Sequence, residues 1–245
     1  MGRTTRRTLL AGLVGIGAAL IPLRFSCAAE EVPRLLDHIL LGCSDLQHGV
    51  SFVEQHLGVR AAFGGVHPGR GTQNALLSLG TRHYLEIIAP DPRQAGATLP
   101  QWLELQRRRL LGLREPRLIG WAAHPGGLDQ FASRLRNAGI AFGGPQPGSR
   151  KRPDGQILNW KTLNLRDDAG VLPFLIEWSA DSPYPSEDTP RGAKLEQFSI
   201  AGPDPAKLES VCKAMGVDVA IKRSERPQLR ARISGPNGKM MELSS

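Results

Sequence analysis

Hydrophobic and polar residues follow a pattern that repeats three times after the first 34 residues. Each repeat begins with a short, almost wholly apolar run, as in LLDHILLGC at residues 35–43. A segment follows in which apolar residues recur every three or four positions until a glycine ends it. Further apolar runs, separated by turn residues, complete the repeat. The pattern predicts a strand, a helix and then a group of strands in each repeat.

The repeats place the predicted elements along the chain. The first predicts a strand at 35–43, a helix at 45–58 and strands at 72–80 and 82–90. The second predicts a strand at 117–125, a helix at 126–139 and strands at 157–165 and 171–179. The third predicts a strand at 194–202, a helix at 204–216 and strands at 217–223, 229–235 and 239–245.

These elements indicate an α+β fold made of repeated units, each with a strand, a helix and further strands. One such unit is too small to bury the face of its sheet alone, so we expect units to pair. Residues 30–180 would hold the first two units. A proline-rich linker at 181–193 would lead to a third, related unit at 194–245.

The first 29 residues follow a different pattern. Three arginines precede an apolar run from Leu9 to Leu23, and small residues follow up to Ala29. This is typical of a cleavable signal peptide, and the run is too short and too glycine-rich for a stable membrane span. The arginine pair in TRRTLL resembles a twin-arginine signal. We therefore expect export to the periplasm or the outside of the cell, with an uncleaved anchor as the alternative.

Charge and composition argue against nucleic acid as a partner. The formal net charge of +8 falls to +4 without the residues up to Ala28, since these include four arginines and no acidic residue. Aromatic residues make up 5% of the chain. A modest positive charge with few aromatic residues does not favour nucleic-acid binding. Cys43 and Cys212 remain after the leader, and the sequence leaves open whether they form a disulfide.

A histidine and a carboxylate interrupt the apolar strands of the first repeat. His38 lies in its first strand and Glu86 in its last. A carboxylate among apolar residues is costly unless something pairs with it. An imidazole and a carboxylate on neighbouring strands are suitable ligands for a divalent metal. Spacing alone leaves a second interpretation open, in which His38 is a core residue held by hydrogen bonds.

The chain resembles the vicinal oxygen chelate superfamily, in its glyoxalase-like branch. The residues that carry the resemblance lie within 35–180 and read LDHILLGCSDL, GGVHPGRGTQNALLSLGTRHYLEIIAP, SRKRPDGQILNW and LPFLIEW. In that superfamily two βαβββ units pair into a cup whose first and last strands supply metal ligands. The resemblance implies His38, Glu86 and Glu177 as ligands of zinc, nickel or manganese. Gly120 falls opposite His38 and supplies no ligand.

The third repeat offers another pairing. By the same alignment Gln197 falls opposite His38, and Glu242 falls opposite Glu86. We expect the first two repeats to form the cup, because the resemblance spans them together. The third would then cap the cup or mediate assembly, and a homodimer is left open.

Two loops add further candidates. Glycines surround His67, which would act as a second acid or base, and Asn74 would point into the cup. Arg152 at the cup mouth would bind a carboxylate or carbonyl group of the substrate. Trp121 and Trp160 would line an apolar wall of the substrate site. The alternative interpretation is a flexible surface loop and two ordinary core tryptophans.

Together these residues favour an enzyme that acts on a small carbonyl or enediolate-type substrate. The metal would polarise the carbonyl group as a Lewis acid, while Glu177 or Glu86 moves a proton. Lyase or isomerase chemistry is expected, since one histidine with two carboxylates is not the ligand set of iron dioxygenases. The alternative is a metal-free cup that binds a small anionic or aromatic molecule.

Overall fold

The computed structural model describes residues 1–2 and 32–245. The signal peptide expected over residues 1–29 therefore lies outside the described residues, apart from its first two. No helix in the part of the chain that the structure describes is long and apolar enough to cross a membrane.

The first two repeats form a single sheet. The first contains β1 (Leu36–Gly42), α1 (Leu46–Leu57), β2 (Ala62–His67), β3 (Thr72–Gly80) and β4 (His83–Pro90). The second contains β5 (Arg117–Ala123), α3 (Leu128–Asn137), β6 (Phe142–Lys151), β7 (Ile157–Leu165) and β8 (Phe174–Trp178). A short 3-10 turn, η1 (Pro92–Gln94), and helix α2 (Gln101–Leu111) connect them. The predicted α+β fold with repeated βαβββ units is confirmed.

The eight strands lie in the order β2-β3-β4-β1-β5-β8-β7-β6. β1 pairs in parallel with β4 and antiparallel with β5, so the first strands of the two units meet at the centre. The sheet curls until its outer strands approach each other. A Cβ at Gly65 on β2 would lie 2.6 Å from the carbonyl oxygen of Lys151 on β6, so only glycine permits this closure.

The third unit has the expected order of elements along the chain, but its strands are ordered differently within their sheet. It contains β9 (Lys194–Gly202), α4 (Pro205–Met215), β10 (Ala220–Arg223), β11 (Gln228–Ser234), η2 (Pro236–Gly238) and β12 (Met240–Ser244). Its strand order is β10-β9-β11-β12. In the first two units the last strand is the parallel neighbour of the first strand, whereas β9 pairs in parallel with β10.

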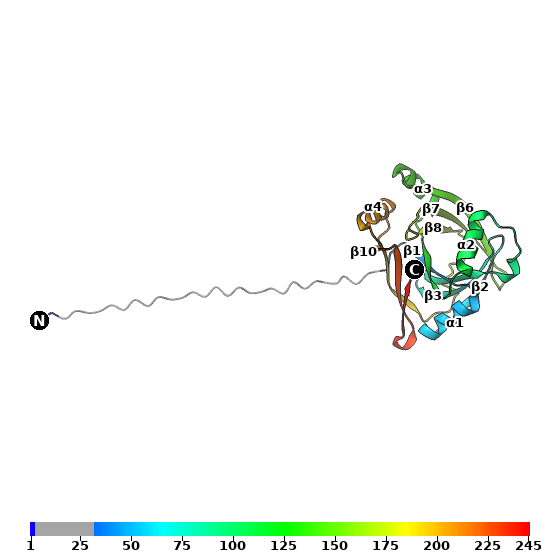
Figure 1. The fold of residues 1–245 in the computed structure, drawn as a ribbon, viewed down its shortest axis with the longest axis horizontal. Coiled ribbons are helices and arrows are strands. Elements are labelled where there is room, and N and C mark those ends of the chain that lie inside the picture. Colours follow the sequence, from blue (N-terminus) through cyan, green and yellow to red (C-terminus); the bar gives the residue numbers. More distant parts are fainter. Residues whose placement is uncertain (3–31) are drawn as a thin grey trace.

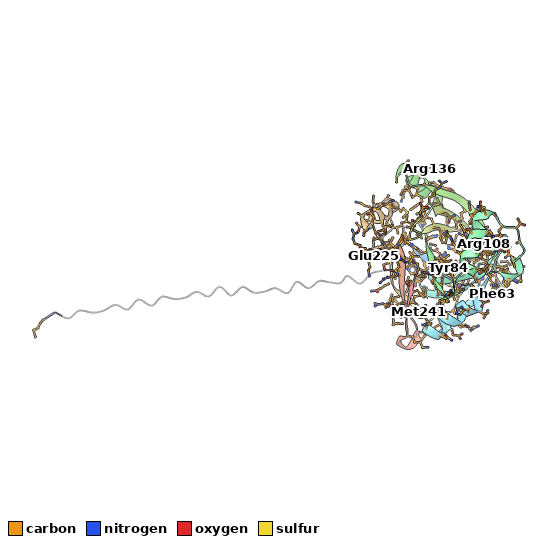
Figure 2. The ribbon with its side chains drawn as sticks, viewed as in Figure 1. Phe63, Tyr84, Arg108, Arg136, Glu225 and Met241 are labelled. Atoms are coloured by element: carbon orange, nitrogen blue, oxygen red, sulfur yellow. The ribbon has the colours of Figure 1, made fainter. Side chains whose placement is uncertain are left out.

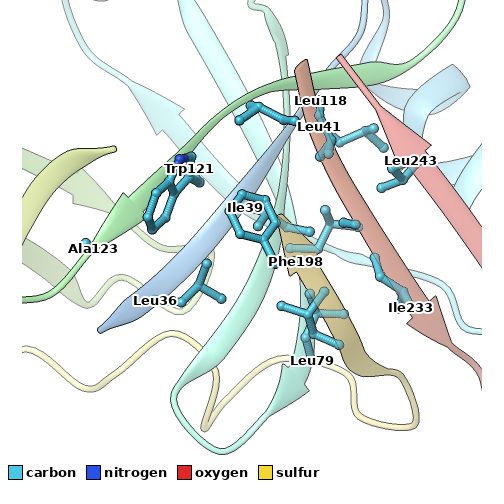
Figure 3. Packing of buried hydrophobic residues seen from close by; sticks show 14 of the residues in the cluster. Leu36, Ile39, Leu41, Leu79, Leu118, Trp121, Ala123, Phe198, Ile233 and Leu243 are labelled. Atoms are coloured by element: carbon cyan, nitrogen blue, oxygen red, sulfur yellow. The ribbon is translucent and has the colours of Figure 1, made fainter. Parts of the chain in front are cut away.

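The third unit packs on the outer face of the curled sheet (Figure 1). The ring of Phe198 lies 5.1 Å from the ring of Trp121, and Figure 3 shows Phe198 beside Ile39 in an apolar layer that also contains Trp121 and Ile233. Trp121 is fully buried there, and its indole nitrogen donates to the carbonyl oxygen of Val171 at 2.8 Å. The prediction that Trp121 lines the substrate site is therefore wrong.

The alternative pairing of the first and third units is also wrong. Gln197 and Glu242 line a separate, largely polar hollow on the far side of the four-stranded sheet. The apolar face of that sheet is already covered by the outer face of the cup. Cys43 and Cys212 are both buried and free, so the disulfide that the sequence left open is not formed.

Candidate active site

A cavity of about 360 Å³ lies inside the curled sheet. Its floor comes from strands of the first unit, one wall comes from β7 and β8 of the second, and α2 lies at its mouth. Polar side chains gather on the first unit's side, where His38, His67, Asn74 and Glu86 are all buried. On the opposite wall β8 presents apolar side chains, among them Phe174 and Ile176, and β7 adds Thr162 and Asn164.

His38 is held from behind by Asp37. Its Nδ1 donates to Asp37 Oδ1 at 2.6 Å. Asp37 Oδ2 accepts hydrogen bonds from the hydroxyl of Tyr184 at 2.6 Å and from the indole of Trp178 at 3.1 Å. The register of β1 against β5 shifts between Leu36 and His38. This irregularity lets the adjacent side chains of Asp37 and His38 both turn inward. Three donors satisfy the buried carboxylate and fix the imidazole ring.

The other ring nitrogen of His38 faces Glu86. His38 Nε2 lies 3.4 Å from Glu86 Oε2, and within the described part of the chain it has no hydrogen-bond partner. The imidazole ring stacks on Tyr84, labelled in Figure 2, with 4.5 Å between ring centroids. Nε2 is therefore the atom of His38 that is left to meet a ligand in the cavity.

Burial and charge set the protonation states of this pair. Burial by itself lowers the pKa of His38, but interactions with the carboxylates of Asp37 and Glu86 outweigh it and raise that pKa to about 9. Burial by itself raises the pKa of Glu86, but His38 outweighs it and lowers that pKa to about 2. At neutral pH the pair is an imidazolium beside a carboxylate.

His67 and Asn74 engage the other oxygen of Glu86. The Asn74 amide donates to Glu86 Oε1 at 2.8 Å, and His67 Nε2 lies 3.8 Å from the same oxygen. His67 Nδ1 is hydrogen-bonded to the hydroxyl of Thr72 at 2.9 Å. Burial lowers the pKa of His67 to about 4, so this imidazole is neutral at neutral pH. Both residues lie in the cup, where the sequence analysis expected them.

Glu177 does not face the cavity. Its Oε2 accepts a hydrogen bond from the backbone nitrogen of Leu128 at 3.0 Å, at the first residue of α3. Phe174, Ile176 and Trp178 line the cavity, and side chains alternate along a strand, so Glu177 points to the opposite face. The predicted alignment of Glu177 with Glu86 is wrong, because Ile176 takes the inward position.

These residues do not fit the metal set that the resemblance implied. The second unit presents Gly120 and Ile176 to the cavity, and neither can bind a metal. His38 and Glu86 remain as two donors, whereas a catalytic zinc site takes three ligands from the protein. Among residues 1–2 and 32–245 no three His, Cys, Asp or Glu side chains form a group that could hold a metal ion.

Of the two arginines at positions 150 and 152, it is Arg150 and not Arg152 that lines the cavity. Arg152 donates to Asp188 at 2.7 Å and lies 3.2 Å from a carboxylate oxygen of Asp154, outside the cavity. Arg150 is buried and donates to Asn74 Oδ1 at 3.4 Å. β6 ends at Lys151, so the alternation that would have aligned Arg152 with Arg150 stops there.

Several parts of the site escaped the sequence analysis. The aspartate at position 37, next to His38 in an apolar strand, was a signal for a buried ionic network. Tyr184 lies in the linker and carried no such signal. Trp102, Leu103 and Leu110 of α2 line the mouth of the cavity, and Trp160 lines its wall as predicted.

A cup formed by two paired βαβββ units, with its buried histidine and glutamate on the first and last strands of one unit, defines a protein of the vicinal oxygen chelate fold. Residues 36–216 match the family model of the glyoxalase-like domain. This match covers most of the chain, and the protein belongs to that family.

A solved structure with a TM-score above 0.5 shows the same fold. A hypothetical protein from Staphylococcus aureus is 15% identical, with a TM-score of 0.58 over 85% of this chain and 84% of its own. Methylmalonyl-CoA epimerase from Mycobacterium tuberculosis is 23% identical, with a TM-score of 0.43 over 59% of this chain and 87% of its own. At such identities the likeness concerns the fold alone. No curated protein matches the chain.

Proposed function

We propose that this protein is a proton-transfer enzyme, of the lyase or isomerase type, that acts on a small carbonyl substrate in the cavity. The observation that carries the proposal is the buried pair of His38 and Glu86, whose facing atoms are 3.4 Å apart beside the cavity. Such a pair supplies an acid and a base to one ligand. Perturbed ionisable groups gathered in a cavity are typical of catalytic sites.

His38 acts on the carbonyl oxygen. Its protonated Nε2 donates a hydrogen bond to that oxygen and stabilises the negative charge that grows there when a neighbouring C–H bond is broken. Asp37 is a positioning residue, since it fixes the ring and keeps the imidazole charged through a 2.6 Å hydrogen bond. No reorientation of the ring is needed during the reaction.

Glu86 accepts the proton from carbon. In the free protein His38 keeps the pKa of Glu86 low. A substrate oxygen that takes the hydrogen bond of His38 weakens this effect, and burial then raises the pKa of Glu86 towards that of a useful base. Asn74 orients the carboxylate through its 2.8 Å hydrogen bond. The protonated carboxyl group of Glu86 then returns the proton to the substrate, while neutral His67 lies 3.8 Å from its Oε1.

A second candidate function is binding without chemistry. The part of the wall formed by β8 supports it, since Phe174, Ile176 and Trp178 offer the ligand no acid or base. A cup of this kind would hold a small anionic or aromatic molecule.

The test is deuterium exchange. Wild-type protein, purified folded without chelators, is incubated in D₂O with a set of 2-oxo and 3-oxo acids, and loss of the proton on the carbon next to the keto group is followed by NMR. Glu86→Gln is expected to slow exchange by about 10²-fold or more, because it removes the base. Metal content of the same wild-type and Glu86→Gln samples is measured by mass spectrometry.

Glu177→Gln is the matched control, since it changes a carboxylate on the outer face of the cup. It should leave the exchange rate unchanged. Equal exchange by wild type and Glu86→Gln would overturn the proposal. Binding of these acids without exchange in wild type would favour the second candidate.

A further inference from the structure

We infer that the substrate carries a carboxylate group, which Arg150 binds, and an apolar remainder that lies against α2. This inference rests on the proposed function, since it names the class of substrate for the same cavity. Four observations support it: an unpaired buried arginine, the charge of the lining, the apolar mouth and the position of Asn74.

Among the described residues, Arg150 is a buried charge without an ionic partner. Its residue is 3% exposed, and its side chain donates a hydrogen bond to Asn74 Oδ1 at 3.4 Å. No carboxylate lies within ion-pair distance of it among the described residues. A buried guanidinium is costly unless it is paired, and it has five donors in a planar fork. A carboxylate matches that fork with two parallel hydrogen bonds.

The cavity lining as a whole is positive. Arg70 and Arg109 also line it, and the structure shows no ion pair for either in the described part of the chain. Glu86 is the single acidic residue of the lining, and it is already engaged by His38 and Asn74. An anionic ligand would therefore meet positive charge on several sides.

The mouth of the cavity is apolar. Trp102 and Ile119 line it although they are 49% and 40% exposed, and Leu103 and Leu110 lie on the same side of α2. Large apolar side chains that line a cavity and remain exposed gain free energy when a ligand covers them. An apolar remainder of the ligand would cover these side chains, while Arg109 of the same helix stays available to the anionic group.

Asn74 sets the distance between the two ends of the site. Its amide oxygen accepts from Arg150, and its amide nitrogen donates to Glu86. The guanidinium and the catalytic carboxylate are thus within reach of one small side chain. A carboxylate bound by Arg150 and a carbon that loses its proton to Glu86 are then only a few bonds apart. An apolar 2-oxo or 3-oxo acid has this arrangement.

The experiment measures binding by the quenching of tryptophan fluorescence, since Trp102, Trp160 and Trp178 line the cavity. The probes are 2-oxooctanoate, octan-2-one, which lacks the carboxylate, and pyruvate, which lacks the apolar chain. We expect 2-oxooctanoate to bind at least tenfold more tightly than either of the others. Affinity should rise with chain length by up to about fourfold per CH₂ group.

Arg150→Met should weaken binding of 2-oxooctanoate at least tenfold, whereas Arg152→Met should not, since Arg152 pairs with Asp188 outside the cavity. Arg150→Lys keeps the charge and loses the fork, so it should weaken binding by a smaller factor. The thermal midpoint shows whether Arg150→Met folds. If Arg150→Met does not fold, the affinity of Arg150→Lys tests the inference instead.

Equal binding of 2-oxooctanoate and octan-2-one would overturn the inference, and so would unchanged affinity in a folded Arg150 variant or no binding of any probe. Carboxylate-dependent binding without deuterium exchange would support the inference while it overturns the proposed function. The two failures are therefore distinguishable.

Discussion

At the scale of single residues, His38 lies between two carboxylates, of which one has fixed surroundings and the other has surroundings that a ligand can change. Asp37 is fully buried and accepts from three donors, so its position is fixed. Glu86 borders the cavity, where an incoming ligand can change its surroundings. The imidazolium therefore has one permanent partner and one adjustable partner. This asymmetry suits a group that must stay charged while its neighbour gains and loses a proton.

The raised pKa of His38 predicts how stability depends on pH. Because this pKa is about 9 in the folded protein and 6.5 as the ordinary value, the stabilisation is fully present below pH 6.5 and is lost as pH rises through about 9. The loss is expected to be on the order of 3 kcal/mol. Urea unfolding of wild type and His38→Gln between pH 6 and pH 10 measures it. Parallel curves for the two proteins would show that His38 is not charged in the folded state.

At the scale of elements, α1 approaches the sheet more closely than a side chain allows. Gly49 lies on its buried face, and a Cβ there would fall 2.6 Å from the sulfur of Cys43 and 2.7 Å from a methyl carbon of Ile87. Glycine within a helix costs about 1 kcal/mol relative to alanine, so its place here has a packing reason. α1 thereby covers the strands that carry His38 and Glu86.

Gly49→Ala is expected to lower the free energy of unfolding by about 1–3 kcal/mol, because the strain of overpacking exceeds the gain in helix propensity. Denaturant unfolding measures this change. Gly96→Ala is the control, since a Cβ at position 96 has no neighbour within 4 Å. A Gly49→Ala protein as stable as wild type would show that α1 can shift without cost.

At the scale of the whole molecule, the third unit shields the back of the site. The outer face of the central strands carries Ile39, Leu41 and Trp121, which are fully buried under Phe198 and its neighbours (Figure 3). Without that cover the back of β1 and β5 would be an apolar surface in water. The linker contributes to the site as well, because Tyr184 reaches Asp37 from it.

Phe198→Ala is therefore expected to lower the free energy of unfolding by about 3–5 kcal/mol, as for other buried aromatic side chains. A single cooperative transition should persist, since the two sheets share one core. Trp102→Ala, which changes a half-exposed aromatic residue at the cavity mouth, should cost much less. Chemical denaturation followed by circular dichroism compares them, and a loss below 1 kcal/mol in Phe198→Ala would contradict the shared core.

Those features that depend on residues close together along the chain could be predicted from the sequence. Apolar runs placed β1 and β4, and cap residues placed the ends of helices, as when Asp45 accepts from the backbone of His48 and Gly58 closes α1 in a left-handed conformation. Alternation along β1 and β4 turned His38 and Glu86 to one face. The same local pattern missed β2 and β6, since their glycines and prolines are tolerated only at the edges of a sheet.

Only the tertiary structure decided which residues complete the site. The bond from Tyr184 to Asp37 joins positions 147 residues apart, and no local pattern encodes such a contact. The choice of Arg150 over Arg152 and of Ile176 over Glu177 depended on where a strand ends and on a one-residue register. Periodicity tells which residues share a face, but the face that becomes the cavity is set by how the sheet curls and what covers its back.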